Sequence, residues 1–397
     1  MSDTAGTPSG SAPGPGAGAS ATGDGLTRRR RRRWTTGSAL GLAALVLLGS
    51  GGGWALYTRL NGNMTADEAA AAELARYERE RPTALVHGAQ NILLIGSDTR
   101  AGDDNGTYGR DSGTARSDTM ILLHLAADRR SATAVSLPRD LMVDVPSCLR
   151  ADGGRSRPAL TMLNYAFETG GSACAVRTVE KLTDIRIDHY AVVDFSGFKK
   201  MVDAVDGVEV CLRKPVDDKA AKLKLPAGRV PLDGEQALGF VRARKTLGDG
   251  SDTDRMQRQQ QFLAALVDKA RSNDILLNPV KLYPLLDAAT SSLTTDPELA
   301  SLRGLYQLVR GLRNIPTEHV QFMTVPRNSY PYDTNRDQLV QPEAGKLFAQ
   351  LRSDKPVTTT KNNPQHSMTN SGKSGGQQPP SPVPTFPGRT AAEDGCA

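Results

Sequence analysis

An uncharged stretch at residues 37–57, GSALGLAALVLLGSGGGWALY, constrains this chain more than any other feature. As a helix it is long enough to cross about 30 Å of hydrocarbon. Trp34, Trp54 and Tyr57 lie near its ends, where aromatic rings favour the membrane interface. A cleaved signal peptide would have a shorter apolar part and a small-residue cleavage site. We therefore predict an uncleaved transmembrane signal anchor over residues 37–57.

Six consecutive arginines, residues 28–33, precede this stretch and account for the whole net charge of +6. Basic residues mark the cytoplasmic side of a membrane span. We expect a single-pass protein of the cell membrane, with a cytoplasmic N-terminus and an extracellular folded domain. A basic run is also typical of nucleic-acid binding. Beside a membrane span, its simplest role is to set topology and attract anionic lipid, so we expect no nucleic-acid partner.

Composition divides the rest of the chain. Residues 1–36 and 354–397 are rich in small, polar and proline residues and cannot bury enough apolar surface to fold, which predicts two disordered tails. Residues 58–84 contain an alanine-rich, charged segment that stops before Pro82, which predicts a stalk helix and linker. Residues 85–353 remain as one extracytoplasmic domain.

Apolar runs bounded by turn residues predict three strands, at residues 91–96, 119–125 and 132–137. Their short connections favour antiparallel neighbours. Strand-like runs and helical periodicity then alternate along the chain, and residues 252–268 predict a strong helix. Such mixing predicts a layered α/β domain. His124 lies in the second apolar run, so we interpret it as a hydrogen-bonded core residue rather than a ligand.

Arginine and aspartate residues come in pairs at the ends of these strands. The three pairs are Asp98 and Arg100, Arg116 and Asp118, and Arg139 and Asp140. If the strands run up, down and up, all three pairs lie at one edge of the sheet. Two further groups extend this set, namely Arg242 and Arg244 in FVRAR, and Asp252, Arg255 and Gln259 on one face of the predicted helix.

Converging guanidinium groups match the oxygens of a phosphate. Aspartates among them would repel that anion unless they hold a hard cation such as Mg²⁺ or Mn²⁺. The pattern therefore predicts a pyrophosphate and a divalent cation, the apparatus of phosphoryl transfer. An isolated Arg-x-Asp is usually a solvated surface pair, and only the meeting of several pairs favours a site. The chain has no Walker loop, GxSxG or HExxH motif.

The four cysteines, Cys148, Cys174, Cys211 and Cys396, form no CxxC pair, which argues against a zinc or redox site. In an oxidising exterior, Cys148 and Cys174 are candidate disulfide partners. Two free thiols at these positions remain the alternative.

Six ordered blocks resemble the LytR-CpsA-Psr family of cell-envelope proteins. They are LLIGSDTR, ARSDTMILLH, SLPRDLMVDVP, TVEKLTDIRIDHYAVVDFSGFKKMVDAVDGVEV, LDGEQALGFVRAR and DTDRMQRQQQFL. The resemblance covers about residues 90–352. It implies a central mixed sheet flanked by helices, in an α-β-α arrangement, with a hydrophobic pocket for a polyprenyl chain. It also implies transfer of a glycopolymer such as teichoic acid from a polyprenyl-pyrophosphate carrier to peptidoglycan.

The same resemblance assigns roles to individual residues. It implies that Asp98 and Asp118 hold Mg²⁺, and that the pyrophosphate binds Arg116, Arg139, Arg242 and Arg244, with Arg100, Arg255 and Gln259 in the same shell and Asp140 and Asp252 supporting it. One position departs from the family pattern: Met162 stands two residues before Asn164, where the family often has lysine. Arg157 is a candidate replacement.

Two other functions remain open. A pyrophosphatase acting on polyprenyl carriers would use the same residues with water as the acceptor. An envelope-linked regulator or binding module would need no chemistry at the charged edge. Accumulation of free polyprenyl phosphate without polymer attachment would favour the hydrolase, and a folded domain inside the cell would favour the regulator.

Overall fold

The structure is a computed structural model. It describes residues 50–98, 116–219, 221–243, 252–271, 278–360 and 385–393. The described residues before Arg59 belong to one unit, and those from Arg59 onward form a second, which contains the fold described below. Within the described residues, no helix has the length and apolar character needed to cross a membrane. Most of the span predicted at residues 37–57 lies outside them.

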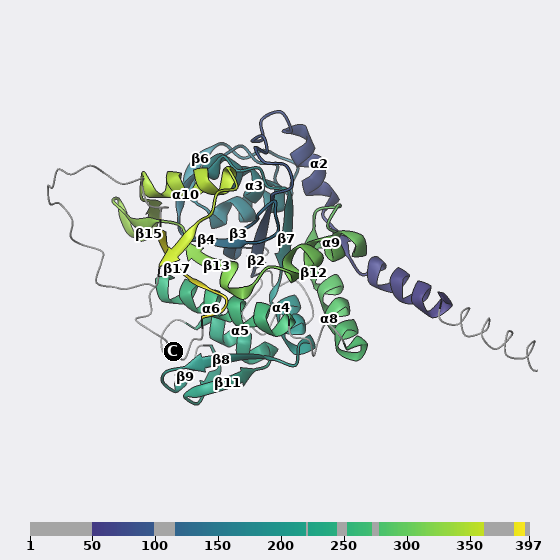
Figure 1. Cartoon of the computed structure of the whole chain (residues 1–397). Coiled ribbons are helices and arrows are strands. Elements are labelled where there is room, and N and C mark those ends of the chain that lie inside the picture. The colour runs from purple at the N-terminus through teal and green to yellow at the C-terminus, as the bar shows by residue number, and fades with distance from the viewer. Residues whose placement is uncertain are drawn as a thin grey trace, which may run out of the picture. The chain divides into compact units, whose positions relative to one another are not determined.

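A mixed sheet of nine strands, counted over the described residues, forms the centre of the second unit (Figure 1). Its order across the sheet is β1 (Thr65–Ala66), β12 (Leu293–Thr295), β7 (His189–Val193), β2 (Gln90–Ser97), β3 (Ser117–Leu125), β4 (Ala132–Leu137), β13 (Val320–Thr324), β17 (Thr385–Thr390) and β16 (Thr358–Thr360). Strand β3 runs antiparallel to both β2 and β4, whereas β7 and β13 run parallel to β2 and β4 respectively.

The three central strands confirm the expectation from the apolar runs. Leu93, Leu122 and Val135 are paired across β2, β3 and β4 and are fully buried. Strands covered on both faces need apolar side chains at nearly every position, which is why these segments lack an alternating pattern. The antiparallel order of β2, β3 and β4 is also as expected.

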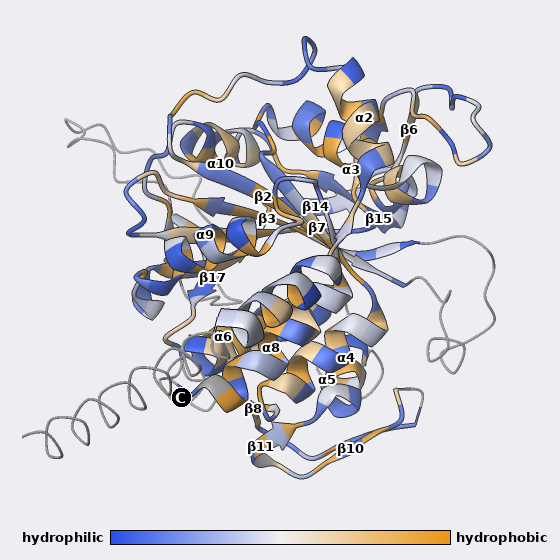
Figure 2. Ribbon diagram, turned by 90° about the vertical axis from the view of Figure 1, so that its right-hand side faces the viewer, coloured by the Kyte–Doolittle hydropathy of each residue, from blue (hydrophilic) through white to orange (hydrophobic). Residues whose placement is uncertain are grey.

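Helices cover both faces of the sheet (Figures 1 and 2). Helices α2 (Glu68–Arg76), α3 (Asn164–Thr183) and α10 (Glu343–Arg352) contribute to a core on one face. Helices α6 (Asp252–Arg271) and α9 (Leu302–Arg313) pack apolar side chains against the other. The expected layered α-β-α architecture with a central mixed sheet is therefore confirmed.

A smaller second core lies beyond α6. It includes side chains of α4 (Phe195–Ala204), α5 (Gly234–Arg242) and α8 (Pro279–Ser292), and of the strand pairs β8 (Val208–Leu212) with β11 (Gly228–Leu232) and β9 (Val216–Asp218) with β10 (Leu223–Leu225). Phe240 and Phe262 are the large side chains at its centre, and both are almost completely buried. Asp233 begins α5 with a capping box that includes Gln236, so this helix has a fixed start.

The segment predicted as a stalk belongs to the fold instead. Strand β1 pairs with β12, and Ala70 and Leu74 of α2 are buried in the core beside α3. The buried Glu73 is paired with Arg155, at 2.9 Å between Oε1 and Nη2. The stalk interpretation took alanine content as a sign of an isolated helix, but the small side chains allow close packing against α3.

The C-terminal segment predicted as disordered also contributes to the sheet. Strand β17 pairs antiparallel with β13, and β16 pairs parallel with β17. Phe386 of β17 is buried in the main core. The predicted boundary at residue 353 is therefore wrong for residues 358–360 and 385–390, and the proline and glycine of the second segment concealed its strand.

Two local expectations are confirmed. Cys148 and Cys174 form a disulfide. His124 is a buried, hydrogen-bonded core residue, with Nδ1 2.8 Å from Asn91 Oδ1 and Nε2 3.0 Å from Asp354 Oδ1. Burial lowers the pKa of His124, against the opposing effect of Asp354.

Candidate active site

Three chain segments meet at one edge of the sheet, as the strand directions predict. Ser97 pairs with Ser117 after a bulge at the end of β2, and Leu137 at the end of β4 pairs with Met120. The residues following β2 and β4 and those preceding β3 therefore share this edge. A bulge increases the local twist and changes the direction of the side chains beside it.

A row of alternating charges lies at this edge. Arg139 donates from Nη1 to Asp118 Oδ1 at 2.8 Å and from Nε to Asp140 Oδ2 at 3.3 Å. Asp140 Oδ1 is in turn 4.0 Å from Nη1 of Arg336, which lies on β15 (Asp333–Leu339). Asp118, Arg139 and Asp140 are each partly exposed. Asp118, Arg139 and Asp140 thus meet as predicted, and strand β15, far along the chain, adds a further guanidinium.

Asp98 and Arg116 are joined through the backbone rather than by an ion pair. The Arg116 amide donates to Asp98 Oδ1 at 2.7 Å, and the Asp98 amide donates to the Arg116 carbonyl at 2.9 Å. The Arg116 guanidinium instead donates to Glu168 on α3, from Nε to Oε2 at 3.1 Å and from Nη2 to Oε1 at 3.4 Å. This bond to Glu168 raises the pKa of Arg116.

Glu168 is a site residue that the sequence analysis missed. It lies in the first part of α3, just before a kink at Gly170 and Gly171. A Cβ atom on Gly170 would come within 3.0 Å of both disulfide Cβ atoms and within 2.7 Å of the Leu149 carbonyl oxygen. The disulfide and the kink therefore pack together, and they set where α3 presents Glu168 to Arg116.

A cavity of about 350 Å³ opens between the sheet and helices α4, α5 and α6. Its walls are mainly apolar, with Ile121 from β3, Phe198 and Met201 from α4, and Phe262 and Leu266 from α6. Its polar lining includes Asp118, Arg242, Arg255 and Gln259. One cavity therefore joins an apolar interior to four of the predicted site residues.

Packing fixes the two arginines in this lining. The guanidinium carbon of Arg242 lies 4.5 Å from the centre of the Phe195 ring, a cation–π contact that aligns the side chain. Arg255 is only 5% exposed. Helix α6 holds the end of α5 through Gln259, whose Nε2 is 3.5 Å from the Val241 carbonyl oxygen, and through a hydrogen bond from Arg258 to the Ala243 carbonyl.

Helix α6 is also attached to the sheet. Gln260 donates to Ser136 Oγ at 3.2 Å and to Thr324 Oγ1 at 3.1 Å. These residues lie at the ends of β4 and β13, on the same edge as the charged row. The glutamine run of α6 therefore fixes the distance between the two walls of the site.

Arg100 and Arg244 lie outside the described residues, and Asp252 is the first residue of α6. Arg336, rather than Arg157, supplies a guanidinium at Met162: it contacts the Met162 sulfur, whereas Arg157 is exposed in the loop before β6 (Ala159–Met162).

The described carboxylates form no cluster of three or more metal-ligating side chains. Asp98 and Asp118 are two carboxylates at one edge, each with at least one oxygen engaged as described above. Mg²⁺ is commonly bound by one or two carboxylates together with water and substrate phosphates. The donor set thus fits an ion that is held jointly with a phosphate ligand.

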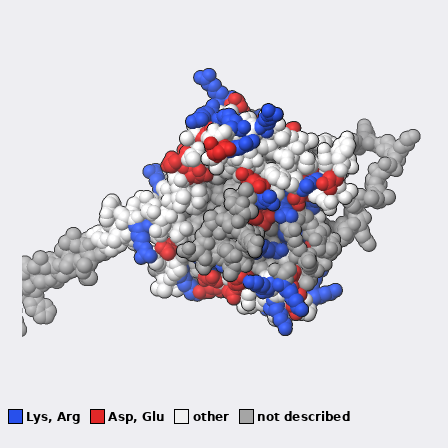
Figure 3. Space-filling model, turned by 180° about the vertical axis from the view of Figure 1, so that it is seen from behind, with Lys and Arg blue, Asp and Glu red and all other residues white. Residues whose placement is uncertain are grey.

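Basic and acidic side chains lie side by side on the face shown in Figure 3. This mixture agrees with the alternating ion pairs of the charged row and with those made by β14 (Arg327–Tyr330) and β15, such as the pair between Arg327 and Asp337. The described residues on this face therefore form no broad basic field.

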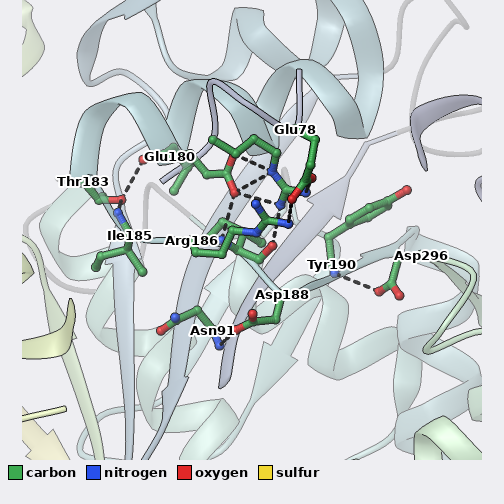
Figure 4. A network of polar contacts seen from close by, with 12 residues as sticks. Glu78, Asn91, Glu180, Thr183, Ile185, Arg186, Asp188, Tyr190 and Asp296 are labelled. Atoms are coloured by element: carbon green, nitrogen blue, oxygen red, sulfur yellow. Dashed lines mark hydrogen bonds and ion pairs between the residues drawn. The ribbon is translucent and has the colours of Figure 1, made fainter. Parts of the chain in front are cut away.

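A second cavity, of about 550 Å³, lies at the opposite edge of the sheet, where β2 begins. Several of the charged groups beside it are paired with one another (Figure 4). The buried Glu180 accepts from Arg81 at 2.8 Å and from the Ile187 amide at 2.9 Å, and Arg186 donates to Glu78 at 2.7 Å. This network anchors residues 78–81 to the end of α3 and to the loop that precedes β7, and its role is therefore structural.

The geometry agrees with comparisons to known proteins. A family model described as the LytR_cpsA_psr family matches residues 57–353. The "Probable cell wall biosynthesis protein LcpB" of Corynebacterium glutamicum is 41% identical over 211 residues, 51% of this chain and 47% of that protein. The chain therefore spans about half the length of that relative.

Two further relatives extend the match. The "Polyisoprenyl-teichoic acid--peptidoglycan teichoic acid transferase TagT" of Bacillus subtilis is 29% identical over 314 residues, 75% of this chain and 89% of that protein. The solved structure of the "LytR-Csp2A-Psr enzyme from Actinomyces oris" has a TM-score of 0.54 at 22% identity, covering 68% of this chain and 93% of that one. At that identity the structural match supports the fold alone.

Proposed function

Because the chain belongs to the LytR_cpsA_psr family, we propose that it is a phosphotransferase of cell-wall biogenesis. It moves a glycopolymer, as a sugar phosphate, from a polyprenyl-pyrophosphate carrier to peptidoglycan. The relative from Bacillus subtilis is named as a transferase that moves teichoic acid from a polyisoprenyl carrier to peptidoglycan, which supports this class of reaction.

The cavity between the sheet and helices α4, α5 and α6 is the observation that carries the proposal. A lipid-linked pyrophosphate has a long apolar chain joined to a compact, multiply charged group. The cavity has the same division, because its walls of Phe198, Met201 and Leu266 lead to Arg242 and Arg255. Burial of the prenyl chain would provide binding energy, while the guanidinium groups orient the phosphates.

The reaction follows from this placement. The oxygen of an acceptor hydroxyl on peptidoglycan attacks the phosphorus that carries the sugar. The bridging P–O bond of the pyrophosphate then breaks, and polyprenyl monophosphate leaves. Arg242, with Arg139 and Arg116 at the rim, stabilises the charge that develops on the phosphate oxygens. The hydroxyl proton passes to a carboxylate at the charged edge, either Asp98 or Asp118.

Asp98 and Asp118 would hold Mg²⁺ or Mn²⁺ together with the substrate phosphates. When bound, such an ion neutralises negative charge on the pyrophosphate. The ion pair between Asp118 and Arg139, at 2.8 Å, keeps both side chains aligned at this edge. Arg139 is therefore able to contact a phosphate oxygen beside the carboxylate that holds the cation.

We further propose that residues 37–57 anchor the chain in the cell membrane with its folded domain outside. The arginines at 28–33 and the uncharged stretch support this topology. The disulfide between Cys148 and Cys174 agrees with an oxidising exterior. An anchored domain would meet a carrier lipid in the same membrane, and protease accessibility on intact cells tests this arrangement.

A transfer assay with the purified full chain in nanodiscs tests the proposed activity. A lipid-linked polymer and peptidoglycan should give covalently attached polymer only when a divalent cation is present. Arg242→Ala should lower the rate by about a hundredfold, the usual effect of removing one donor to a developing charge. Arg116→Ala should also lower it.

Arg229→Ala is the matched control, because Arg229 is 56% exposed and pairs with Glu209 on the β8–β11 strand pair. This variant should retain full transfer. Full transfer by both Arg116→Ala and Arg242→Ala would refute the site assignment. Release of polymer phosphate into solution, with none attached to peptidoglycan, would identify a hydrolase instead.

A further inference from the structure

Helix α9 has two unlike sides. Leu308 and Leu312 pack against the core between the sheet and α6. On the other side, Arg303, Tyr306, Arg310 and Arg313 are exposed and follow one another at helical spacing, so they share one face. We call these four residues the α9 outer face. Tyr306 is 63% exposed, and the neighbouring Val309 is 48% exposed.

All the charged residues of the α9 outer face are basic. The sequence of the helix, LRGLYQLVRGLR, contains no acidic residue. Within the described part of the chain, no carboxylate forms a salt bridge with Arg303, Arg310 or Arg313. This contrasts with the charged row of the active site, where each guanidinium contacts a carboxylate. Three arginines around an exposed tyrosine match the chemistry of an anionic lipid surface.

The beginning of α9 is bonded to the chain segment that follows the predicted membrane span. The Leu302 amide, at the first position of the helix, donates to Asn61 Oδ1 at 3.2 Å. Asn63 donates to Asp287 of α8 at 3.2 Å, and Leu60 is only 4% exposed. The segment after the predicted span is thus attached to both helices.

The tether between the span and α9 is short. Asn61 follows Tyr57, the last residue of the predicted span, by four residues. Even fully extended, four residues reach at most about 14 Å. The amino end of α9 is therefore confined to the neighbourhood of the lipid headgroups whenever the span is inserted. Arg59, which is exposed, adds a further positive charge within the tether.

We propose that the α9 outer face docks on the anionic lipid surface beside the membrane anchor. Arg303, Arg310 and Arg313 attract the headgroups, and Tyr306 inserts its ring at the interface. Docking would restrict how the domain tilts on its tether, and so fix the direction from which its cavity receives a lipid substrate. This inference rests on the membrane anchoring proposed above.

Quenching of a tryptophan by lipid tests the docking. The full chain carrying Tyr306→Trp is placed in phosphatidylcholine nanodiscs that contain phosphatidylglycerol and a headgroup-spin-labelled lipid. Subtracting the signal of the parent chain removes the contributions of Trp34 and Trp54. Tyr332→Trp is the matched control, because Tyr332 is 87% exposed and lies in the β14–β15 hairpin, away from α9.

We expect the added tryptophan of Tyr306→Trp to be quenched about twofold or more strongly than that of Tyr332→Trp. Replacing Arg303, Arg310 and Arg313 with glutamine should bring the quenching down to the level of the control variant. Raising the salt concentration to roughly 0.5 M should do the same without any further substitution, because salt screens surface charge. The salt measurement keeps the test valid if the glutamine variant folds poorly.

Quenching in Tyr306→Trp no stronger than in Tyr332→Trp would overturn the docking. So would quenching that neither salt nor the glutamine variant reduces, because the tether alone would then explain it.

Polymer transfer measured on the same nanodiscs reports separately on the proposed function. Intact transfer without the stronger quenching would refute only the docking, whereas quenching without transfer would refute only the catalytic role. A chain that does not co-elute with the nanodiscs would refute the anchoring and the docking together.

Discussion

Glu168 binds Arg116 through two hydrogen bonds, so the arginine that immediately precedes β3 is oriented by a carboxylate on α3. Glu168 binds Nε and Nη2 of Arg116, and the third nitrogen, Nη1, points away from Glu168. A guanidinium held along one side still presents donors to a phosphate on the other. Glu168 is thus a positioning residue that acts through Arg116.

Replacing Glu168 with glutamine should raise the KM for the lipid-linked donor by about two- to fivefold, in keeping with the modest energy of a half-exposed ion pair. The rate at saturation should change less, because the other arginines remain. Steady-state transfer assays measure both parameters. In an Arg116→Ala background, Glu168→Gln should have little further effect. An equal loss in both backgrounds would show that Glu168 does not act through Arg116.

Filling the apolar cavity should exclude the prenyl chain. Met201→Trp adds bulk among the side chains that line the cavity, and overpacking of this kind costs about 1–3 kcal/mol. We expect about tenfold less prenyl-phosphate lipid to co-purify with the chain, as measured by mass spectrometry. Lys200→Trp is the control, since Lys200 is exposed on the same helix. Equal lipid content in the two variants would refute the cavity as the prenyl site.

Removal of the disulfide should destabilise the domain. The Cys148–Cys174 link closes a loop with a sequence separation of 26, and cross-links of this size contribute about 3 kcal/mol. The double substitution of both cysteines by serine should lower the denaturant midpoint of the full chain by a corresponding amount. An unchanged midpoint would show that packing alone holds this loop.

Gly170 should tolerate no side chain. Gly170→Ala would place a methyl group 2.7 Å from the Leu149 carbonyl oxygen, at a cost of about 2 kcal/mol. Because the kink also presents Glu168, we expect the KM for the donor to rise as in Glu168→Gln. Gly62→Ala is the control, since no atom lies within 4 Å of its added carbon. Similar stability of the two variants in denaturant titrations would contradict the packing argument.

The pair of His189 and Asp296 should make stability depend on pH. The hydrogen bond that His189 donates to Asp296, with Nδ1 3.2 Å from Oδ1, raises the pKa of His189 despite its burial. A raised histidine pKa gives stability that is fully present below the unfolded value of about 6.5 and is lost as the pH rises through the folded pKa. Burial opposes ionisation of Asp296, but His189 outweighs it and the pKa of Asp296 falls. Its contribution is lost only as the pH falls through that lowered value.

His189→Gln should therefore be less stable than the parent by about 1–2 kcal/mol near pH 5, with the difference shrinking above pH 7. Unfolding free energies of both chains between pH 4 and 8 measure it. Comparison with the parent is needed because buried His124, whose pKa is lowered, has the opposite dependence. A difference independent of pH would mean that the two residues interact only as neutral groups.

The central strands and the shared edge were predictable because they depend on local signals. Buried strands appear as apolar runs, and the short connection between β3 and β4 leaves few choices of direction. The meeting of Asp118, Arg139 and Asp140 follows from that topology. Arg242 and Arg255 were recognised through their motifs, whereas their common cavity depends on how α5 and α6 pack.

Contacts between distant segments were not predictable in this way. Glu168 precedes two glycines in a stretch without clear periodicity, and nothing in its neighbourhood indicates Arg116 as a partner. Arg336 reaches Met162 from a strand more than a hundred residues later in the chain. Helix α2 did carry a usable signal, because Ala70 and Leu74 are four residues apart and share a face.

Strand β17 also affects how this protein should be produced. Cutting the chain at residue 353, where the composition changes, would strip the outer neighbour from β13 and leave Gln321, Phe322 and Met323 without their antiparallel partners. A bare strand edge recruits strands from other molecules. A shortened protein of that kind would therefore self-associate through β13, and it would also lack Phe386 from the main core.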